Sequence, residues 1–472
     1  MSRWSEAVLR KWVSLGPRFL PFADVATPDL PLSRLLRLSL FQVSVGMTMV
    51  LLVGTLNRVM IVELGVPTSL VAVMIALPLV FAPFRALIGF SSDHHRSALG
   101  WRRVPFLWKG TMWQFCGYAF MPFAILVLAG KGESHQYPAW MGQIAAAAAF
   151  LAVGAGMHTV QTAGLALATD LTPKESHPKV VGLMYVTLLL GMMGSALLFG
   201  VALENYIHAK LVGVIQGTAL ATLFLNVVAM WKQETRRPGR FQPEREEEPS
   251  FREAWAHFCQ GDHAIRRLVI VGIGTLAFGL SEVILEPFGG QVLELEVSST
   301  TKLTALLAFG GLCGFGYASR ILRRGSDVQR VTQLGLLLGV PGFVLVLSTP
   351  VTGILPLFLV GNFLVGFGGA IFGHATLTDT MNRAPKDQVG LALGAWGAVQ
   401  ATAAGSAMAL SGILRDVFDG VLGGGTAAGY NAVYVIELVL LVVTIVVVAP
   451  LVRSTAPRPD LYGGGAPQGG RA

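Results

Sequence analysis

The chain has 472 residues, of which 53% are hydrophobic and only 13% are charged, and its mean hydropathy is +0.61. This composition excludes a water-soluble globular protein, which would need far more polar surface at this length, and indicates a protein that crosses a membrane many times. The net charge of +8 follows from the membrane topology described below, so it does not indicate nucleic-acid binding.

Twelve apolar stretches are long enough to cross a bilayer as α-helices, because about 20 helical residues span its hydrocarbon core of roughly 30 Å. The sequence therefore predicts an all-α polytopic membrane protein with twelve transmembrane helices. These helices are expected at residues 36–62, 68–90, 105–130, 140–168, 180–203, 210–231, 266–288, 302–321, 331–349, 351–378, 388–413 and 430–452.

The apolar stretches form two groups of six, separated by a charged segment that is typical of a solvated linker. Aromatic residues on one face predict an interfacial helix in the N-terminal segment and an amphipathic helix in the linker. The Pro- and Gly-rich tail is expected to be disordered. The predicted divisions are a cytoplasmic N-terminal segment, a first six-helix half, a cytoplasmic linker, a second six-helix half and a cytoplasmic tail, at residues 1–35, 36–231, 232–265, 266–452 and 453–472.

Basic residues are distributed unevenly between the two sides of the predicted helices. Most of the 35 Lys and Arg residues lie in the termini, the linker and the loops on the same side, whereas the other loops carry only Lys131, Lys210, Lys302 and Arg415. The positive-inside rule therefore predicts that both termini are cytoplasmic. The basic side is also expected to attract anionic lipids.

A short motif occurs twice, at the same place in each half. The predicted fourth helix ends at a Thr-Asp pair containing Asp170, and a polar loop with proline leads to Val-Gly-Leu at Gly182. The predicted tenth helix repeats this pattern with Asp379 and Gly390. We interpret the motif as an internal repeat that relates two six-helix halves.

Two acidic residues, Glu282 and Glu286, lie one helical turn apart inside the predicted seventh helix, so their side chains share one face. A charged side chain near the bilayer centre costs roughly 2.5–3.5 kcal/mol on insertion scales, so this pair needs a partner or a ligand. Pro287 and two glycines follow, and they predict that the helix breaks or ends directly after the pair.

Arg58 is the candidate partner of the acidic pair. Alignment of Gly54 with Gly279 places Arg58 beside Glu282 in the pseudo-symmetric helix. An ion pair with Glu282 or Glu286 would remove most of the cost of burying both charges. The alternative is that the Arg58 side chain extends to the outer interface of the membrane.

The predicted second helix ends in a loop with Gly89 and Asp93, followed by the basic residues Arg102 and Arg103. A Gly-x-x-x-Asp at a helix end before a basic cluster resembles the signature loop of the major facilitator superfamily, although the spacing from Asp93 to Gly100 is longer than usual. The resemblance implies the fold of that superfamily, with two pseudo-symmetric halves of six helices.

Sequence signatures of enzymes are missing. The chain contains no Walker-type nucleotide loop, no His-Glu-x-x-His, no nucleophile elbow and no dinucleotide fingerprint in a strand-helix context. We therefore expect no enzymatic activity, no nucleotide and no free metal ion.

Four segments resemble a narrower family within the superfamily, the PucC/LhaA branch, also called the bacteriochlorophyll delivery family. The similarity covers roughly residues 30–452, and its Glu-Pro-Phe-Gly-Gly segment is specific. Within this branch the chain looks more like LhaA, the assembly factor for the light-harvesting complex LH1, than like PucC proper, which is tied to LH2. The segments are RLSLFQVSVGMTMVLLVGTLNRVMIVELGVP, LPLVFAPFRALIGFSSDHHRSALGWRRVPF, LEPFGGQVLELEVSSTT and TDTMNRAPKDQVGLALGAWGAVQATAAG.

The resemblance implies a non-enzymatic assembly factor in the cytoplasmic or intracytoplasmic membrane of a phototrophic bacterium. The implied pigments are bacteriochlorophyll a and carotenoid. The implied partners are the LH1 α and β polypeptides, reaction-centre assembly intermediates, bacteriochlorophyll synthase and the membrane-insertion machinery. A homo-oligomer is also compatible with the resemblance.

A bound chlorin would need a ligand for its magnesium ion, and either a His nitrogen or a carboxylate neutralised by a cation is suitable. Glu282 or Glu286, neutralised by Arg58, is therefore one candidate ligand. His158 and His374 are the others, and for each the alternative is a histidine that has a local hydrogen-bond partner within the bundle.

Two further functions compete with assembly. Secondary transport of a small amphiphile or tetrapyrrole by alternating access is also compatible with a twelve-helix repeat that buries carboxylates. A membrane enzyme acting on tetrapyrroles has the least support, because the sequence contains no catalytic constellation.

Overall fold

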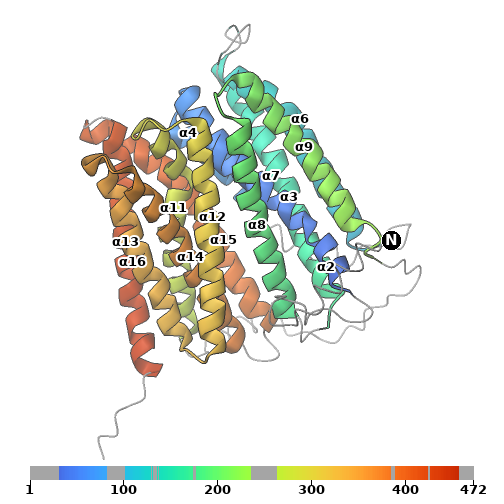
Figure 1. The fold of residues 1–472 in the computed structure, drawn as a ribbon, viewed down its shortest axis with the longest axis vertical. Coiled ribbons are helices and arrows are strands. Elements are labelled where there is room, and N and C mark those ends of the chain that lie inside the picture. The colour runs from blue at the N-terminus through green and yellow to red at the C-terminus, as the bar shows by residue number, and fades with distance from the viewer. Residues whose placement is uncertain are drawn as a thin grey trace, which may run out of the picture.

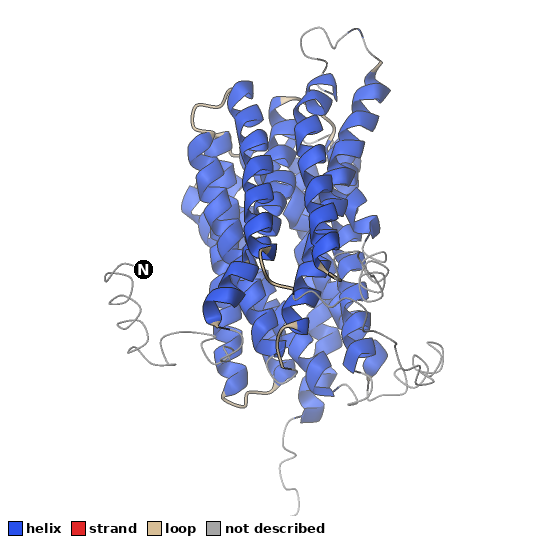
Figure 2. Cartoon of the chain, turned by 90° about the vertical axis from the view of Figure 1, so that its right-hand side faces the viewer, coloured by secondary structure: helices blue, strands red, loops and turns tan. Residues whose placement is uncertain are grey.

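The computed structural model describes residues 31–81, 101–128, 130, 136, 138–173, 177–234, 263–383, 389–423 and 426–455. The regular elements within these ranges are helices, so the all-α prediction is confirmed (Figure 2). The interfacial helix predicted near the N-terminus, Gly89 and Asp93 of the loop motif, most of the linker and the C-terminal tail lie outside the described residues.

The first transmembrane helix runs from Leu32 to Glu63 but changes its winding on the way. Two α-helical segments, α2 (Leu32–Leu38) and α3 (Leu40–Met49), precede two π-helical segments, η2 (Val50–Leu56) and η3 (Val59–Glu63). Asn57 and Arg58 lie between the π-helical segments. Because a π-helical hydrogen bond spans one residue more than an α-helical one, these segments rotate the following side chains away from the directions of a regular α-helix.

The other helices of the first half are α4 (Thr68–Ala76), its 3₁₀ continuation η4 (Leu77–Phe81), α6 (Val104–Leu128), α7 (Ala139–Asp170), α8 (His177–Ala202) and α9 (His208–Met230). The second half consists of α11 (Ala264–Gln291), α12 (Val297–Arg323), α13 (Val328–Thr352), α14 (Leu355–Arg383), α15 (Val389–Leu422) and α16 (Thr426–Thr455). Local signals set some of these bounds. The carboxylate of Asp327 accepts a hydrogen bond from the Arg330 amide at the start of α13, and Gly353, with φ +68°, ends that helix.

Within the described residues, eleven helices are long and apolar enough to cross a membrane. The predicted second helix is described only as far as Phe81, and its apolar part Thr68–Leu79 is shorter than the other spans. The chain is therefore a multi-pass membrane protein, as predicted. The predicted break after Glu286 is wrong in position, because α11 continues through Pro287 and ends at Gln291.

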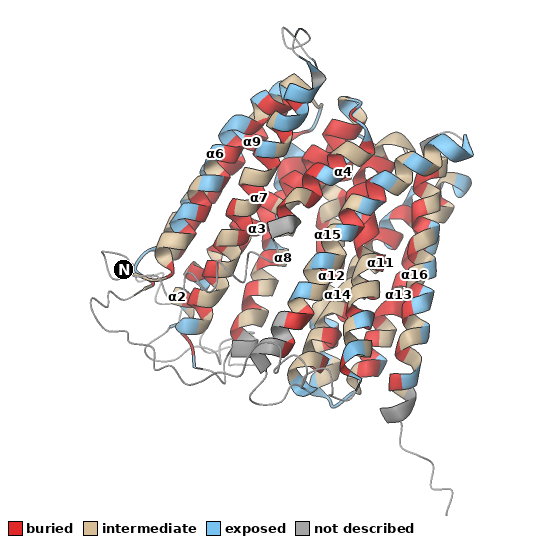
Figure 3. Ribbon diagram, turned by 180° about the vertical axis from the view of Figure 1, so that it is seen from behind, coloured by how far each residue is buried: buried red, intermediate tan, exposed pale blue. Residues whose placement is uncertain are grey.

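Figure 1 shows the two groups of helices side by side, the first half in blue to green and the second half in yellow to red. Helix α8 packs against α12, and α4 packs against α15, so these two pairs join the halves. We call the end of the bundle with Arg102, Arg267 and Arg323 the basic end. The end with the loops 203–207 and 292–296 is the opposite end, and buried residues are frequent there, around α4 (Figure 3).

Helices within the second half approach each other closely at glycines. A Cβ atom at Gly310 of α12 would lie 2.3 Å from the carbonyl oxygen of Phe363, and one at Gly366 of α14 would lie 2.2 Å from that of Leu307. Side chains at these positions would collide with backbone, so the glycines allow α12 and α14 to pack in direct contact.

Candidate functional site

Glu286 lies on α11 at the seam between the two halves and is 3% exposed. Its Oε1 accepts a hydrogen bond from the hydroxyl of Thr304 on α12, whereas its buried Oε2 makes no hydrogen bond. Gly54 of η2 faces this carboxyl group from the first half, and a Cβ atom there would lie 2.5 Å from Oε1. The absence of a side chain at Gly54 therefore allows the halves to meet at Glu286.

Glu282, one turn earlier on α11, has a different environment from Glu286. Its side chain is exposed, although its neighbours Ser281 and Val283 are buried. The exposed side chain is nevertheless surrounded by protein beyond its immediate neighbours, so it faces the interior of the bundle rather than lipid. The two carboxyl groups predicted to act together thus differ in their access to ligands.

Arg58 does not pair with either carboxyl group, so that prediction is wrong. Its guanidinium group forms an ion pair with Glu63, one turn further along the same helix, and donates a hydrogen bond to the carbonyl oxygen of Leu295 at 3.0 Å. Adjacent Asn57 donates its side-chain N–H to the carbonyl oxygen of Val283. Both residues therefore bind the second half through its backbone, and the contacts of Arg58 lie at the opposite end.

Other polar contacts between the halves gather at the opposite end. Lys302 at the start of α12 pairs with Glu204 after α8 at 3.1 Å. The backbone amide of Ser69 at the start of α4 donates to the carboxylate of Asp416 on α15 at 2.7 Å. Together with the contacts of Arg58 and Asn57, these bonds hold the halves together at this end.

Glu437 of α16 is a further carboxyl group, and the sequence analysis did not connect it to the acidic pair. It is fully buried, and Ser281 of α11 is the polar group beside its carboxyl group. Glu282 of α11 lies within electrostatic reach of it. A single acid within a long apolar span was the signal that could have identified this position.

The two candidate histidines do not join the acidic pair. His158 of α7 is 6% exposed within the first half. His374 of α14 shares a hydrogen bond with the Ser319 hydroxyl at 3.1 Å, and the Phe315 ring lies 4.3 Å from its own ring, centroid to centroid. Among the described residues, no three His, Cys, Asp or Glu side chains form a group that could hold a metal ion.

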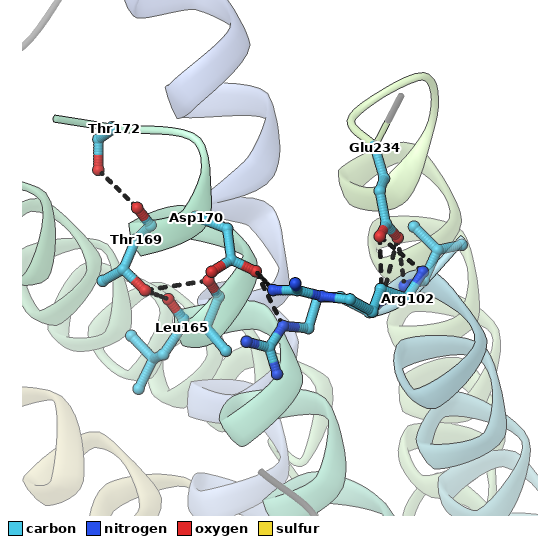
Figure 4. A network of polar contacts seen from close by, with 9 residues as sticks. Arg102, Leu165, Thr169, Asp170, Thr172 and Glu234 are labelled. Carbon is cyan, nitrogen blue, oxygen red and sulfur yellow. Dashed lines mark hydrogen bonds and ion pairs between the residues drawn. The ribbon is translucent and has the colours of Figure 1, made fainter. Parts of the chain in front are cut away.

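A separate polar network lies at the basic end of the first half (Figure 4). Asp170 at the end of α7 forms ion pairs with Arg102 and Arg103, each at 2.9 Å. The carboxylate of Glu234 accepts hydrogen bonds from the backbone amides of Arg102, Arg103 and Val104 at 2.6, 3.0 and 3.0 Å, so it caps the start of α6. Sequence reasoning assigned Glu234 only to the linker.

The repeated motif has the same kind of surroundings in the second half. Asp379 of α14 forms ion pairs with Arg267 of α11 at 3.1 Å and with Arg383 at 2.8 Å. Gly182 lies in the second turn of α8 and Gly390 in the first turn of α15, the helices that follow the two aspartates. Each repeat aspartate therefore binds arginines at the basic end of its own half.

Comparison with known proteins identifies the family. The sequence model of the PUCC protein family matches residues 55–456. The chain belongs to the PucC family. It is 60% identical to Protein PucC of Rhodovulum sulfidophilum over 418 residues, which cover 88% of this chain and 92% of that protein. Protein PucC of Cereibacter sphaeroides is 55% identical over 458 residues, covering 96% and 98%.

A more distant relative is the bacteriochlorophyll synthase 44.5 kDa chain of Rhodobacter capsulatus, 27% identical over 84% of this chain and 87% of that protein. The predicted family is thus confirmed. The narrower assignment to LhaA stays a prediction, because the two most similar of these relatives are named PucC.

Solved structures confirm the fold. A bacterial homologue of the lysosomal transporter Spinster, in an inward-facing and unoccupied conformation, superposes with a TM-score of 0.65 at 14% identity, covering 90% of this chain and 98% of that one. A bacterial homologue of ferroportin superposes with a TM-score of 0.63 at 15% identity, covering 89% and 98%. This chain therefore has the fold of these transporters, which is the fold that the sequence predicted.

Proposed function

We propose that this protein is an assembly factor for the LH1 light-harvesting complex, which docks nascent antenna polypeptides and handles bacteriochlorophyll and carotenoid in the membrane. Membership of the PucC family across residues 55–456 is the observation that carries this proposal. The similarity to a protein named as a bacteriochlorophyll synthase chain supports the link to pigment. The function needs no catalytic step from this chain.

The predicted carboxylate ligands do not fit the magnesium ion of a chlorin. A carboxylate ligand needs a neutralising cation, and Arg58 is committed to Glu63. Glu286 is further blocked, because Thr304 binds one of its oxygens and Gly54 leaves no space beside that atom. We therefore do not assign the role of magnesium ligand to either carboxyl group of the pair.

The histidines fit no better. Ser319 occupies one ring nitrogen of His374, and Phe315 lies against the ring, so an axial bond to a chlorin would displace both contacts. His158 is buried between packed helices of the first half. In our proposal the polypeptide cargo supplies the magnesium ligand, and this chain holds the apolar parts of the pigment.

The proposed partners are the LH1 α and β polypeptides and reaction-centre assembly intermediates, together with bacteriochlorophyll synthase and the insertion machinery. The arginines at the basic end, among them Arg102, Arg320 and Arg323, suit the anionic lipids of a cytoplasmic leaflet. This placement gives both termini the cytoplasmic location that the basic residues predict.

A deletion strain tests the proposed function directly. Cells without the gene should lose LH1 absorbance while retaining LH2 absorbance, and a plasmid copy should restore it. Protein purified in mild detergent from complemented cells should carry LH1 polypeptides and pigment absorbance. Normal LH1 in the deletion strain, or selective loss of LH2 instead, would contradict the proposal.

Transport is the second candidate, favoured by the contacts that close the opposite end through Arg58, Lys302 and Asp416. Closure at one end is what alternating access requires of a two-half bundle. Proteoliposomes separate the two functions. Proton-dependent uptake of a tetrapyrrole precursor by colourless protein, without bound antenna polypeptides, would favour transport over assembly.

A further inference from the structure

Glu437 is assigned no role in the assembly function or in the contacts that close the opposite end. It is the only charged residue in the candidate span Ala427–Val452, which is the most apolar of the candidate spans. Its side chain is 0% exposed, and the polar group beside its carboxyl group is the neutral Ser281 of α11. A buried carboxylate that has a serine but no cation beside it is strongly unfavourable, so this position needs a ligand that neutralises it.

Helices α11, α13 and α15 pack against α16, and their basic side chains do not supply that neutralisation. Among the described residues, the charged and titratable groups that act electrostatically on Glu437 are Glu282 of α11 and Tyr434 of its own helix. The basic residues of these helices bind elsewhere: Arg415 pairs with Asp416 over the Tyr430 ring, Arg266 donates to the carbonyl oxygen of Val447, Arg267 pairs with Asp379, and Arg330 lies at the basic end.

An unpartnered hydroxyl group lies beside Glu437. The hydroxyl of Tyr434, nearly one turn earlier on α16, is fully buried and makes no hydrogen bond. The tyrosine hydroxyl can donate to a carboxyl group and can also accept from a protonated one. An added proton is therefore needed here to remove the buried charge, and it also supplies a second donor.

A metal ion does not suit the position, because the described residues contain no cluster of three metal-ligating side chains. A proton needs no coordination shell. We propose that Glu437 and Glu282 form a proton-binding site, in which Glu437 holds a proton within the second half and Glu282 exchanges it with the interior of the bundle. This inference does not rest on the assembly function.

The exchange step is a simple proton transfer. A hydronium ion in the bundle interior gives its proton to the exposed Glu282 carboxylate and leaves a water molecule. The O–H bond on Glu282 then breaks as an O–H bond forms on Glu437, so Glu282 becomes a carboxylate again and Glu437 becomes neutral. Ser281, which joins Glu282 on the same turn of α11, donates its hydroxyl to the Phe278 carbonyl at 3.0 Å.

Infrared spectroscopy of the purified full-length protein tests the site. The carbonyl stretch of a protonated carboxyl group is separate from that of a carboxylate, and it shifts when deuterium replaces the proton. At neutral pH, Glu437→Gln should lose a protonated-carboxyl band that the unchanged protein has. Glu437→Asp should shift that band rather than remove it, which tests the assignment with a variant that keeps the acid.

Glu282→Gln tests the exchange role. It should retain the Glu437 band but slow its shift after transfer into deuterium oxide by at least several-fold. Glu294→Gln, which changes an exposed carboxyl group in the loop after α11, is the matched control and should leave both band and exchange rate unchanged. An unchanged band in Glu437→Gln, or equal exchange rates in Glu282→Gln and the control, would overturn the proposal.

Discussion

Gly54 of η2 and Glu286 of α11 meet across the seam between the two halves, where a Cβ atom at residue 54 would lie 2.5 Å from Glu286 Oε1 and 3.2 Å from the Thr304 hydroxyl oxygen. At this contact the first half contributes a glycine, which has no side chain, and the second half contributes the buried carboxyl group of Glu286. The distance between the halves therefore depends on the position of this carboxyl group.

Gly54→Ala should therefore destabilise the protein. The added methyl group must displace the Glu286 carboxyl group from Thr304 or move the halves apart, and overpacking of this kind costs about 1–3 kcal/mol. Thermal unfolding in detergent measures the effect. Gly194→Ala on α8 is the control, because a Cβ there meets open space. Equal unfolding temperatures for the two variants would contradict the predicted collision.

Close packing of α12 and α14 gives a second prediction. Gly366→Ala places a methyl group against the carbonyl oxygen of Leu307, and backbone cannot move away as a flexible side chain can. We expect a loss of stability of about 2 kcal/mol or more, with a lower yield of folded protein. Gly373→Ala on the same helix, where nothing lies within 4 Å, should match the unchanged protein in both measurements.

The cap on α6 predicts a local effect. Glu234→Ala removes the acceptor of three backbone amides at the start of this helix, and loss of a helix cap costs about 0.5–2 kcal/mol. Hydrogen exchange measured by mass spectrometry should become faster in the first turn of α6 and stay unchanged in α13, whose own cap is Asp327. Faster exchange throughout the protein, or none in α6, would count against a local capping role.

Tyr206, in the loop between α8 and α9, predicts a pH dependence. Burial, with a smaller effect of the Glu63 charge, raises its pKa from 10.0 to about 12, and the Arg58 cation opposes the shift. The folded state therefore holds this proton more tightly than the unfolded state does. The stability from this difference is complete below pH 10 and is lost as the pH rises through about 12.

Tyr206→Phe removes that titration. We expect the difference in unfolding temperature between the unchanged protein and the variant to fall from pH 9 to pH 11, because only the unchanged protein loses stability through Tyr206 over this range. Tyr317→Phe, which changes an exposed tyrosine on α12, is the control for the loss of a phenol group. A difference that stays constant with pH would refute the prediction.

The sequence alone determined the class of protein, the places of the apolar spans and the internal repeat. Hydropathy is a property of a continuous segment, so helices such as α9 and α13 could be located without knowledge of their neighbours. The acidic residues in α11 were equally visible, because a charge within an apolar span is conspicuous wherever the helix lies. The resemblance to the PucC family likewise rested on residues adjacent in sequence.

The tertiary structure decided which polar groups meet. Alignment of Gly54 with Gly279 placed Arg58 beside Glu282, whereas in the folded chain Arg58 pairs with Glu63. The direction of a side chain depends on how its helix is wound and rotated about its axis, and π-helical segments lie on both sides of Arg58. The cap by Glu234 joins positions far apart in the chain, and no local pattern encodes such a contact. Sequence therefore specified what each helix contains, whereas packing specified what each side chain touches.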